Sequence, residues 1–133
     1  MSRLLVDIYS FGYLRSGPPP DETENNGGFV FDCRFLPNPG VQARFALHSG
    51  LDAAVREFLE SKPEAITFMN HVIALIDAAI ASYEARGYTH LHVAFGCTGG
   101  QHRSVFCAER LGAHLRENNI ACNITHTERS MWT

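Results

Sequence analysis

Residues 89–126 constrain the fold most, because two kinds of hydrophobic periodicity follow one another within this short stretch. "YTHLHVAFG" has the two-residue period of a strand, and "RSVFCAERLGAHLREN" has the period of an amphipathic helix. "IACNITH" then has the composition of a second strand. Strand, helix and strand form a βαβ unit, in which the strands run parallel and are joined by a right-handed crossover. The segment therefore predicts an α/β fold.

The rest of the chain fits the same class. "RLLVDIYSF" and the alternating "FVFDCRFL", residues 29–36, are predicted strands, and residues 18–28, rich in Pro, Gly and Asn, are a predicted flexible loop. Residues 50–61 and 62–87 have helical spacing, with Gly87 as a stop signal. We expect one domain over residues 1–133, with a mixed sheet, the βαβ unit in its C-terminal half and helices packed on the sheet.

Composition narrows the function. The net charge of −3 argues against a generic nucleic-acid binder, which usually carries a basic excess. No apolar run approaches the length of a membrane span, and the first residues do not resemble a signal peptide. The cysteines show no C-x-x-C spacing, so we expect reduced thiols in a cytoplasmic protein that does not enter a membrane; they are Cys33, Cys97, Cys107 and Cys122.

The loop "GCTGGQH" has the properties of an anion site. It joins the carboxyl end of a strand to the amino end of a helix, where ligands bind in α/β sheets. Gly99 and Gly100 allow backbone N–H groups to approach a ligand, and the helix dipole favours negative charge. Arg103 can add a charge-assisted fork. The further polar side chains are Thr98, His102 and Ser104. A plain tight turn capped by Ser104 is the simpler alternative.

Two separated motifs carry a resemblance to a known family. "GCTGGQHRSVF" and "VFDCRFLPNPG", with the opening "SFGY", resemble the carboxyl-terminal domain of the RapZ/YvcJ family. The resemblance implies a domain that senses an amino-sugar phosphate or nucleotide sugar, pairs into a homodimer and, in some members, binds small regulatory RNA. It also implies a P-loop domain that this sequence lacks. The ending "ITHTERSMWT" has no Lys/Arg-rich tail, so we expect RNA binding to be absent or weak.

The resemblance also implies a set of site residues. Matched by position, they are Cys97, Thr98, Gly99, Gly100, His102, Arg103 and Ser104 from the first motif, and Asp32, Arg34 and Asn38 from the second. Some family members carry a histidine where this chain has Gly40. We expect a non-catalytic sensing domain that binds a phosphate-bearing small molecule and needs no cofactor. His90 and His92 have a spacing that metals use, but without a third ligand we expect no metal site.

Two other functions remain open. Cys97, Gly100, Arg103 and Ser104 fit the C-x-x-G-x-x-R-S loop of cysteine-dependent phosphatases, in which a thiolate attacks phosphorus. Gly96 stands where those enzymes carry histidine, and Asp32 is the only acid at a suitable place. The second alternative is an RNA-binding adapter. The sequence does not choose between a sugar phosphate, a nucleotide sugar, a nucleotide and free phosphate.

Overall fold

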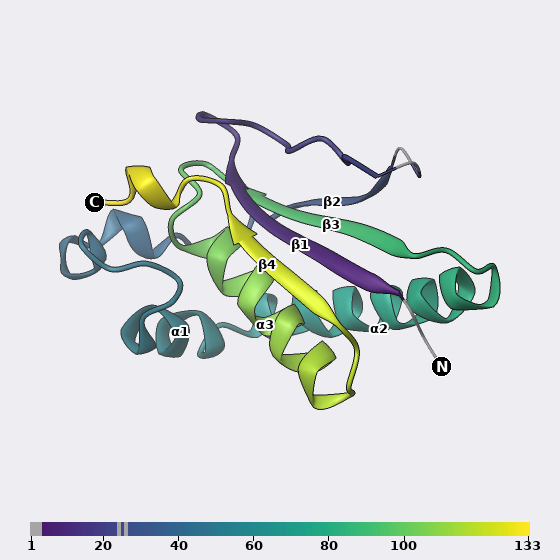
Figure 1. The fold of residues 1–133 in the computed structure, drawn as a ribbon. Coiled ribbons are helices and arrows are strands. Elements are labelled where there is room, and N and C mark those ends of the chain that lie inside the picture. Colours follow the sequence, from purple (N-terminus) through teal and green to yellow (C-terminus); the bar gives the residue numbers. More distant parts are fainter. Residues whose placement is uncertain (1–3, 24, 26) are drawn as a thin grey trace.

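A computed structural model describes residues 4–23, 25 and 27–133, which form a four-stranded sheet with helices on one face (Figure 1). The strands are β1 (Leu5–Gly12), β2 (Gly28–Asp32), β3 (His90–Cys97) and β4 (Cys122–His126), in the order β2-β3-β1-β4. The helices are α1 (Ala53–Glu60), α2 (Pro63–Ala85) and α3 (Arg103–Glu117). The predicted α/β class and the packing of helices on the sheet are confirmed.

The sheet is parallel throughout rather than mixed. All three strand pairs, β1–β3, β1–β4 and β2–β3, run parallel. The physical reason lies in the connections, because parallel strands need long crossovers and every connection between consecutive strands is of that length, at residues 13–27, 33–89 and 98–121. β3 and β4 are parallel as predicted, but β1 lies between them. Gly12 therefore pairs with Cys97, and the carboxyl ends of β1 and β3 meet at one edge.

The core lies between the sheet and the helices. Val6 and Ile8 of β1 and Val93 and Phe95 of β3 are fully buried, as their alternation along each strand predicts. The helices cover them with fully buried apolar side chains, among them Met69, Ile76, Leu111 and Leu115. The opposite face of the sheet is crossed by the connection between β1 and β2 (Figure 1).

That connection contains the predicted flexible loop, residues 18–28, of which residues 24 and 26 lie outside the described part of the chain. The carboxylate of Asp21 accepts hydrogen bonds from the backbone N–H groups of Thr23, at 2.9 Å, and Gly27, at 3.0 Å. The amide of Asn25 donates to the carbonyl of His90 at 2.7 Å. The hydrogen bonds of Asp21 shape the loop itself, and that of Asn25 attaches it to the start of β3.

β2 ends at Asp32, four residues before the predicted end of the strand at residue 36. The N–H of Cys33 still donates to Gly96, but the N–H of Leu36 turns back to the carbonyl of Cys33. Phe35 therefore points away from the core and is 62% exposed. The alternation of apolar residues continues past the point at which the backbone turns, so it overestimated the length of the strand.

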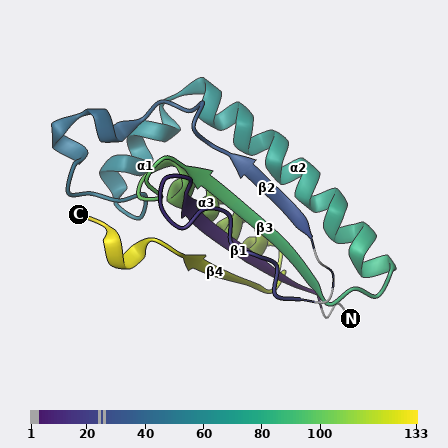
Figure 2. The same ribbon diagram turned by 90° about the horizontal axis from the view of Figure 1, so that it is seen from above.

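α2 is the longest helix, with 23 residues, and it contains an 18-residue stretch with a mean hydropathy of 1.6. By length and composition alone it could cross a membrane, although Asn70, His71 and Asp77 interrupt it, so it contains no uninterrupted apolar run of that length. In the structure α2 lies along the sheet (Figure 2) and buries one side of its surface in the core. The core helix of a compact α/β domain has the same properties. The buried residues are Ala65, Met69, Val72, Ile76 and Ile80.

α2 ends at the predicted glycine. Gly87 has φ of 75°, and its N–H donates to the carbonyl of Glu84. The N–H of Tyr88 reaches back to the carbonyl of Tyr83, and their rings pack 4.7 Å apart. These two hydrogen bonds and the apolar contact are the features of a Schellman helix end.

Candidate functional site

A cavity of about 230 Å³ opens at the edge where β1 and β3 end. Three segments meet around it: the loop after β1, the turn after β2, and the glycine loop between β3 and α3. This is the edge at which parallel α/β sheets bind ligands. The lining residues are Arg15, Asn38, Gly40, Val41, Cys97, Thr98, Gly99, Gln101, His102 and Arg103. The structure thus brings six of the ten predicted site residues to one cavity.

The backbone of the glycine loop is polarised. Its carbonyl groups point to neighbouring segments: the carbonyls of Cys97 and Thr98 accept from the N–H groups of Tyr13 and Leu14. By contrast, the N–H groups of residues 98–102 donate no hydrogen bond to any described residue. Unpaired backbone donors at the amino end of a helix are the basis of an anion-binding site.

The two central glycines have different environments. A Cβ atom on Gly99 would meet nothing within 4 Å, and Gly99 lines the cavity. Gly100 has φ of 75° and is buried, and a Cβ there would lie 2.6 Å from Cγ of Glu128 and 2.8 Å from the nitrogen of Gly12. Gly100 does not line the cavity. It allows the loop to turn beneath the end of β1.

Arg103 is only 5% exposed and serves mainly as a bridge between loops. Its Nη1 donates to the carbonyls of Arg34, at 2.7 Å, and Leu36, at 3.2 Å. Its Nη2 donates to Oγ1 of Thr98 at 3.4 Å. The buried Nε has no hydrogen-bond partner within the described residues. The guanidinium therefore reaches the cavity with part of its donors already committed to the turn after β2.

Cys97 and Ser104 form a buried pair behind the loop. The thiol of Cys97 donates to Oγ of Ser104 at 3.1 Å, and the N–H of Ser104 donates back to Sγ at 3.4 Å. Cys97 is 3% exposed, and Ser104 is fully buried and does not line the cavity. The pair joins the end of β3 to the first turn of α3.

Asp32 and Arg34 lie outside the cavity. They form a two-pronged ion pair with a shortest distance of 2.7 Å, and the guanidinium of Arg34 stacks 4.1 Å from the ring centre of Tyr13. The hydrogen bond from Arg34 lowers the pKa of the Asp32 carboxyl below its usual value, although both side chains are about half exposed. The ion pair thus holds each of the two side chains in place through the other.

The turn after β2 reaches the cavity further along, at Asn38. Its Oδ1 accepts from the N–H of Gly40, and Nε2 of His102 lies 3.0 Å from the carbonyl oxygen of Phe45. A side chain at Gly40 would begin 3.0 Å from Oδ1 of Asn38 and 3.4 Å from Nδ1 of His102. The absence of a side chain at residue 40 thus leaves part of the cavity open.

Arg15 is the main lining residue that sequence reasoning missed. Its side chain is exposed and makes no hydrogen bond or ion pair with any described residue. It follows β1 and lies two residues beyond the "SFGY" segment that contributed to the family resemblance. Strand order could have identified Arg15, because residues that follow neighbouring parallel strands gather at one edge of the sheet. Gln101 and Val41 also line the cavity and were not predicted.

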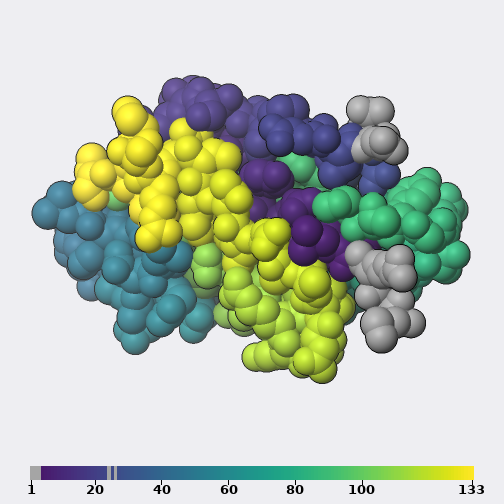
Figure 3. All heavy atoms as spheres, in the orientation of Figure 1, coloured from purple at the N-terminus to yellow at the C-terminus, as the bar shows by residue number. Residues whose placement is uncertain are grey.

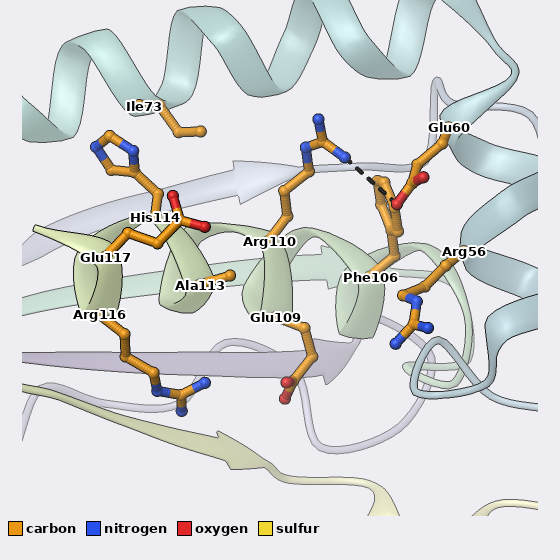
Figure 4. A pocket seen from close by; sticks show the side chains of 10 residues that line it. All are labelled: Arg56, Glu60, Ile73, Phe106, Glu109, Arg110, Ala113, His114, Arg116 and Glu117. Carbon is orange, nitrogen blue, oxygen red and sulfur yellow. Dashed lines mark ion pairs between the residues drawn. The ribbon is translucent and has the colours of Figure 1, made fainter.

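Other hollows lie elsewhere on the part of the chain that the structure describes. One, of about 450 Å³, lies beside α3, where charges of both signs alternate and Arg110 lies 3.5 Å from Glu60 (Figure 4). Another, of about 520 Å³, lies beside Tyr9 and His90 near the start of β3. His90 pairs with Asp7 at 3.0 Å. No group of three potential metal ligands was found among the described residues.

Comparison with known proteins finds matches over nearly the whole chain. The family model of the RapZ C-terminal domain matches residues 4–130. A nucleotide-binding protein of Halorhodospira halophila is 40% identical over 129 residues, which are 97% of this chain and 43% of that protein. A nucleotide-binding protein of Citrifermentans bemidjiense is 39% identical over 92% of this chain and 41% of its own length. This chain thus spans about two fifths of these relatives.

Proposed function

The chain belongs to the RapZ C-terminal domain family, and from this premise we propose that it binds a phosphate-bearing small molecule in the cavity beside the glycine loop. The bound molecule is a sugar phosphate, a nucleotide sugar or a nucleotide, and the domain acts as a sensor rather than as an enzyme. The names of the relatives, which are nucleotide-binding proteins, support this ligand class.

The observation that carries the proposal is the row of unpaired N–H groups at residues 98–102. A buried or half-buried backbone donor without a partner costs free energy, and residues 99–102 of this run are buried or half-buried. Here they form one contiguous run at the start of α3, where the helix dipole adds a partial positive charge. A phosphate group supplies acceptor oxygens and negative charge together.

The side chains around the cavity complement the same group. Arg15 and Arg103 bring positive charge from two different loops, and Thr98 brings a hydroxyl group. The volume of about 230 Å³ equals roughly seven to eight water molecules at about 30 Å³ each. That space holds a phosphate and part of a sugar, so the remainder of a larger nucleotide would lie across the opening.

A titration followed by NMR tests this proposal. Inorganic phosphate, an amino-sugar phosphate and a nucleotide are added separately, with the unphosphorylated amino sugar as the matched control. We expect the phosphorylated ligands to shift the amide signals of residues 98–103 and the control to leave them unchanged. At 100 times its Kd a ligand also raises the apparent stability by about 2.7 kcal/mol. Shifts confined to other surfaces would contradict the proposal.

The geometry supports binding better than phosphatase chemistry. A phosphatase arginine must hold the phosphoryl oxygens, whereas Nη1 of Arg103 is bonded to two backbone carbonyls. Asp32, the candidate for proton transfer, is paired with Arg34 outside the cavity. Cys97 does line the cavity, so its reactivity can be tested directly.

The charge of the chain favours a small ligand over RNA. The sequence has 14 acidic residues against 11 Lys and Arg, which gives a net charge of −3. Affinity for RNA depends on many phosphate contacts. We therefore propose that RNA binds weakly and without sequence preference.

A further inference from the structure

Beside the cavity, the loop that follows β1 also binds a negatively charged group, and this group is a carboxylate of the chain itself. The side chain of Glu128, just after β4, is 3% exposed. Its Oε2 accepts from the N–H groups of Gly12, at 3.0 Å, and Ser16, at 3.1 Å. Its Oε1 accepts from the hydroxyl of Ser16 at 2.9 Å. One carboxylate thus binds both ends of the loop that follows β1.

This arrangement leaves every N–H group of that loop satisfied. Between the two residues that bind Glu128, the N–H groups of Tyr13 and Leu14 donate to the carbonyls of the glycine loop, and that of Arg15 donates to Gly12. In the neighbouring glycine loop, by contrast, the N–H groups of residues 98–102 donate to no described residue. The loop after β1 thus already binds a carboxylate of the chain itself, whereas the donors of the glycine loop are free to bind an external anion.

Arg15 lies inside the segment that Glu128 holds. It stands next to Ser16, three residues after Gly12, and its free guanidinium lines the cavity. Figure 3 shows the C-terminal residues, in yellow, adjoining the purple segment that follows β1. Glu128 also occupies the space that a side chain at Gly100 would need. The same acid therefore contacts the loop that carries Arg15 and the loop that carries the unpaired N–H groups.

We propose that Glu128 is a positioning residue for the anion site, fixing the backbone from which Arg15 reaches the bound phosphate. This inference rests on the proposed function. The inference requires that the length of the Glu128 side chain matters, because that length lets its oxygens accept the hydrogen bonds of the loop. Its negative charge by itself repels a phosphate. A residue that merely stabilised the fold would lower phosphate affinity independently of Arg15.

A double-mutant cycle with inorganic phosphate tests the coupling by calorimetry. Arg15→Ala removes a charge-assisted contact and should weaken binding about tenfold. Glu128→Ala should weaken it to a similar extent. If Glu128 acts through Arg15, the double variant should lose no more than about tenfold, because coupled residues are not additive. A loss of about 100-fold in the double variant, or an unchanged affinity in Glu128→Ala, would overturn the inference.

Two conservative variants separate the effect of side-chain length from the effect of side-chain charge. Glu128→Gln keeps the length and one acceptor oxygen, so its phosphate affinity should stay within about threefold of the parent. Glu128→Asp keeps the charge but withdraws the oxygens by one methylene, so it should weaken binding almost as much as alanine does. Glu128→Asp also replaces the alanine variant in the cycle if that variant does not fold. A phosphate affinity that is higher in Glu128→Asp than in Glu128→Gln would refute the positioning role.

Asp21→Ala is the matched control, because Asp21 likewise accepts hydrogen bonds from loop N–H groups, but in the connection remote from the cavity. It should leave phosphate affinity unchanged. A measurement without phosphate makes the test independent of the proposed function. The NMR order parameter of the Arg15 amide should be near 0.85 in the parent and in Glu128→Gln, and should fall below about 0.6 in Glu128→Asp. Equal order parameters in all three proteins would overturn the inference, whereas a parent that fails to bind phosphate would refute the proposed function.

Discussion

Alanine at two adjacent glycines should have opposite consequences. In Gly100→Ala the new Cβ must lie 2.6 Å from Glu128 Cγ, 2.8 Å from the Gly12 nitrogen and 2.9 Å from the Phe11 carbonyl carbon. Two of these atoms belong to the backbone of β1 and cannot move aside cheaply. The residue must also keep φ at 75°, which an alanine adopts only at a cost of about 1 kcal/mol. Overpacking adds about 1–3 kcal/mol.

We therefore expect Gly100→Ala to lower the free energy of unfolding by about 3 kcal/mol and Tm by roughly 10 °C. Gly99→Ala places its methyl group in open space, so its stability should stay within about 0.5 kcal/mol of the parent. The same methyl group narrows the cavity that Gly99 lines, and phosphate affinity should fall.

Urea unfolding followed by circular dichroism measures both free energies under one protocol. Each glycine is the matched control for the other, since the substitutions are chemically identical and one residue apart. Equal destabilisation by the two variants would refute the assigned packing of the loop. A Gly100→Ala protein as stable as the parent would do the same.

Three further predictions concern single side chains. Arg103→Ala leaves two carbonyl groups without their donor, so urea unfolding should show a loss of about 3 kcal/mol, whereas a loss below about 1 kcal/mol would contradict its bridging role. The parent protein should release no phosphate from an aryl phosphate at neutral pH, and steady release that disappears in Cys97→Ser would establish phosphatase activity instead. Burial alone raises the pKa of Glu128, but the hydrogen bonds from Gly12, Ser16 and Thr127 outweigh it and place this pKa below its usual value of 4.5. The stability that Glu128 contributes is therefore complete above pH 4.5 and is lost as the pH falls through the lowered pKa, so the urea midpoint should fall less steeply with acid in Glu128→Gln.

Local features of the chain were predictable from the sequence. The periods of β3 and α3 indicated a strand and a helix, and the glycine at residue 87 marked the end of α2. The glycine loop between β3 and α3 could be recognised as a candidate site because its position follows from the order of the elements. These features depend on the backbone geometry of contiguous residues, which a sequence pattern records directly.

Tertiary contacts decide which of the candidate site residues face the cavity and which are packed against other segments. Gly99 and Gly100 are identical in sequence, yet only the second lies beneath β1. Arg103 is bonded to carbonyls nearly seventy residues away, at Arg34 and Leu36.

The insertion of β1 between β3 and β4 completes the cavity, because it brings the loop with Arg15 to the glycine loop. Strand order determines which loops become neighbours, and no local period encodes it. The sequence by itself thus determined the elements and the glycine loop. Only the packing of distant segments decided which donors stay open, which are bound by Glu128, and which residues face the cavity.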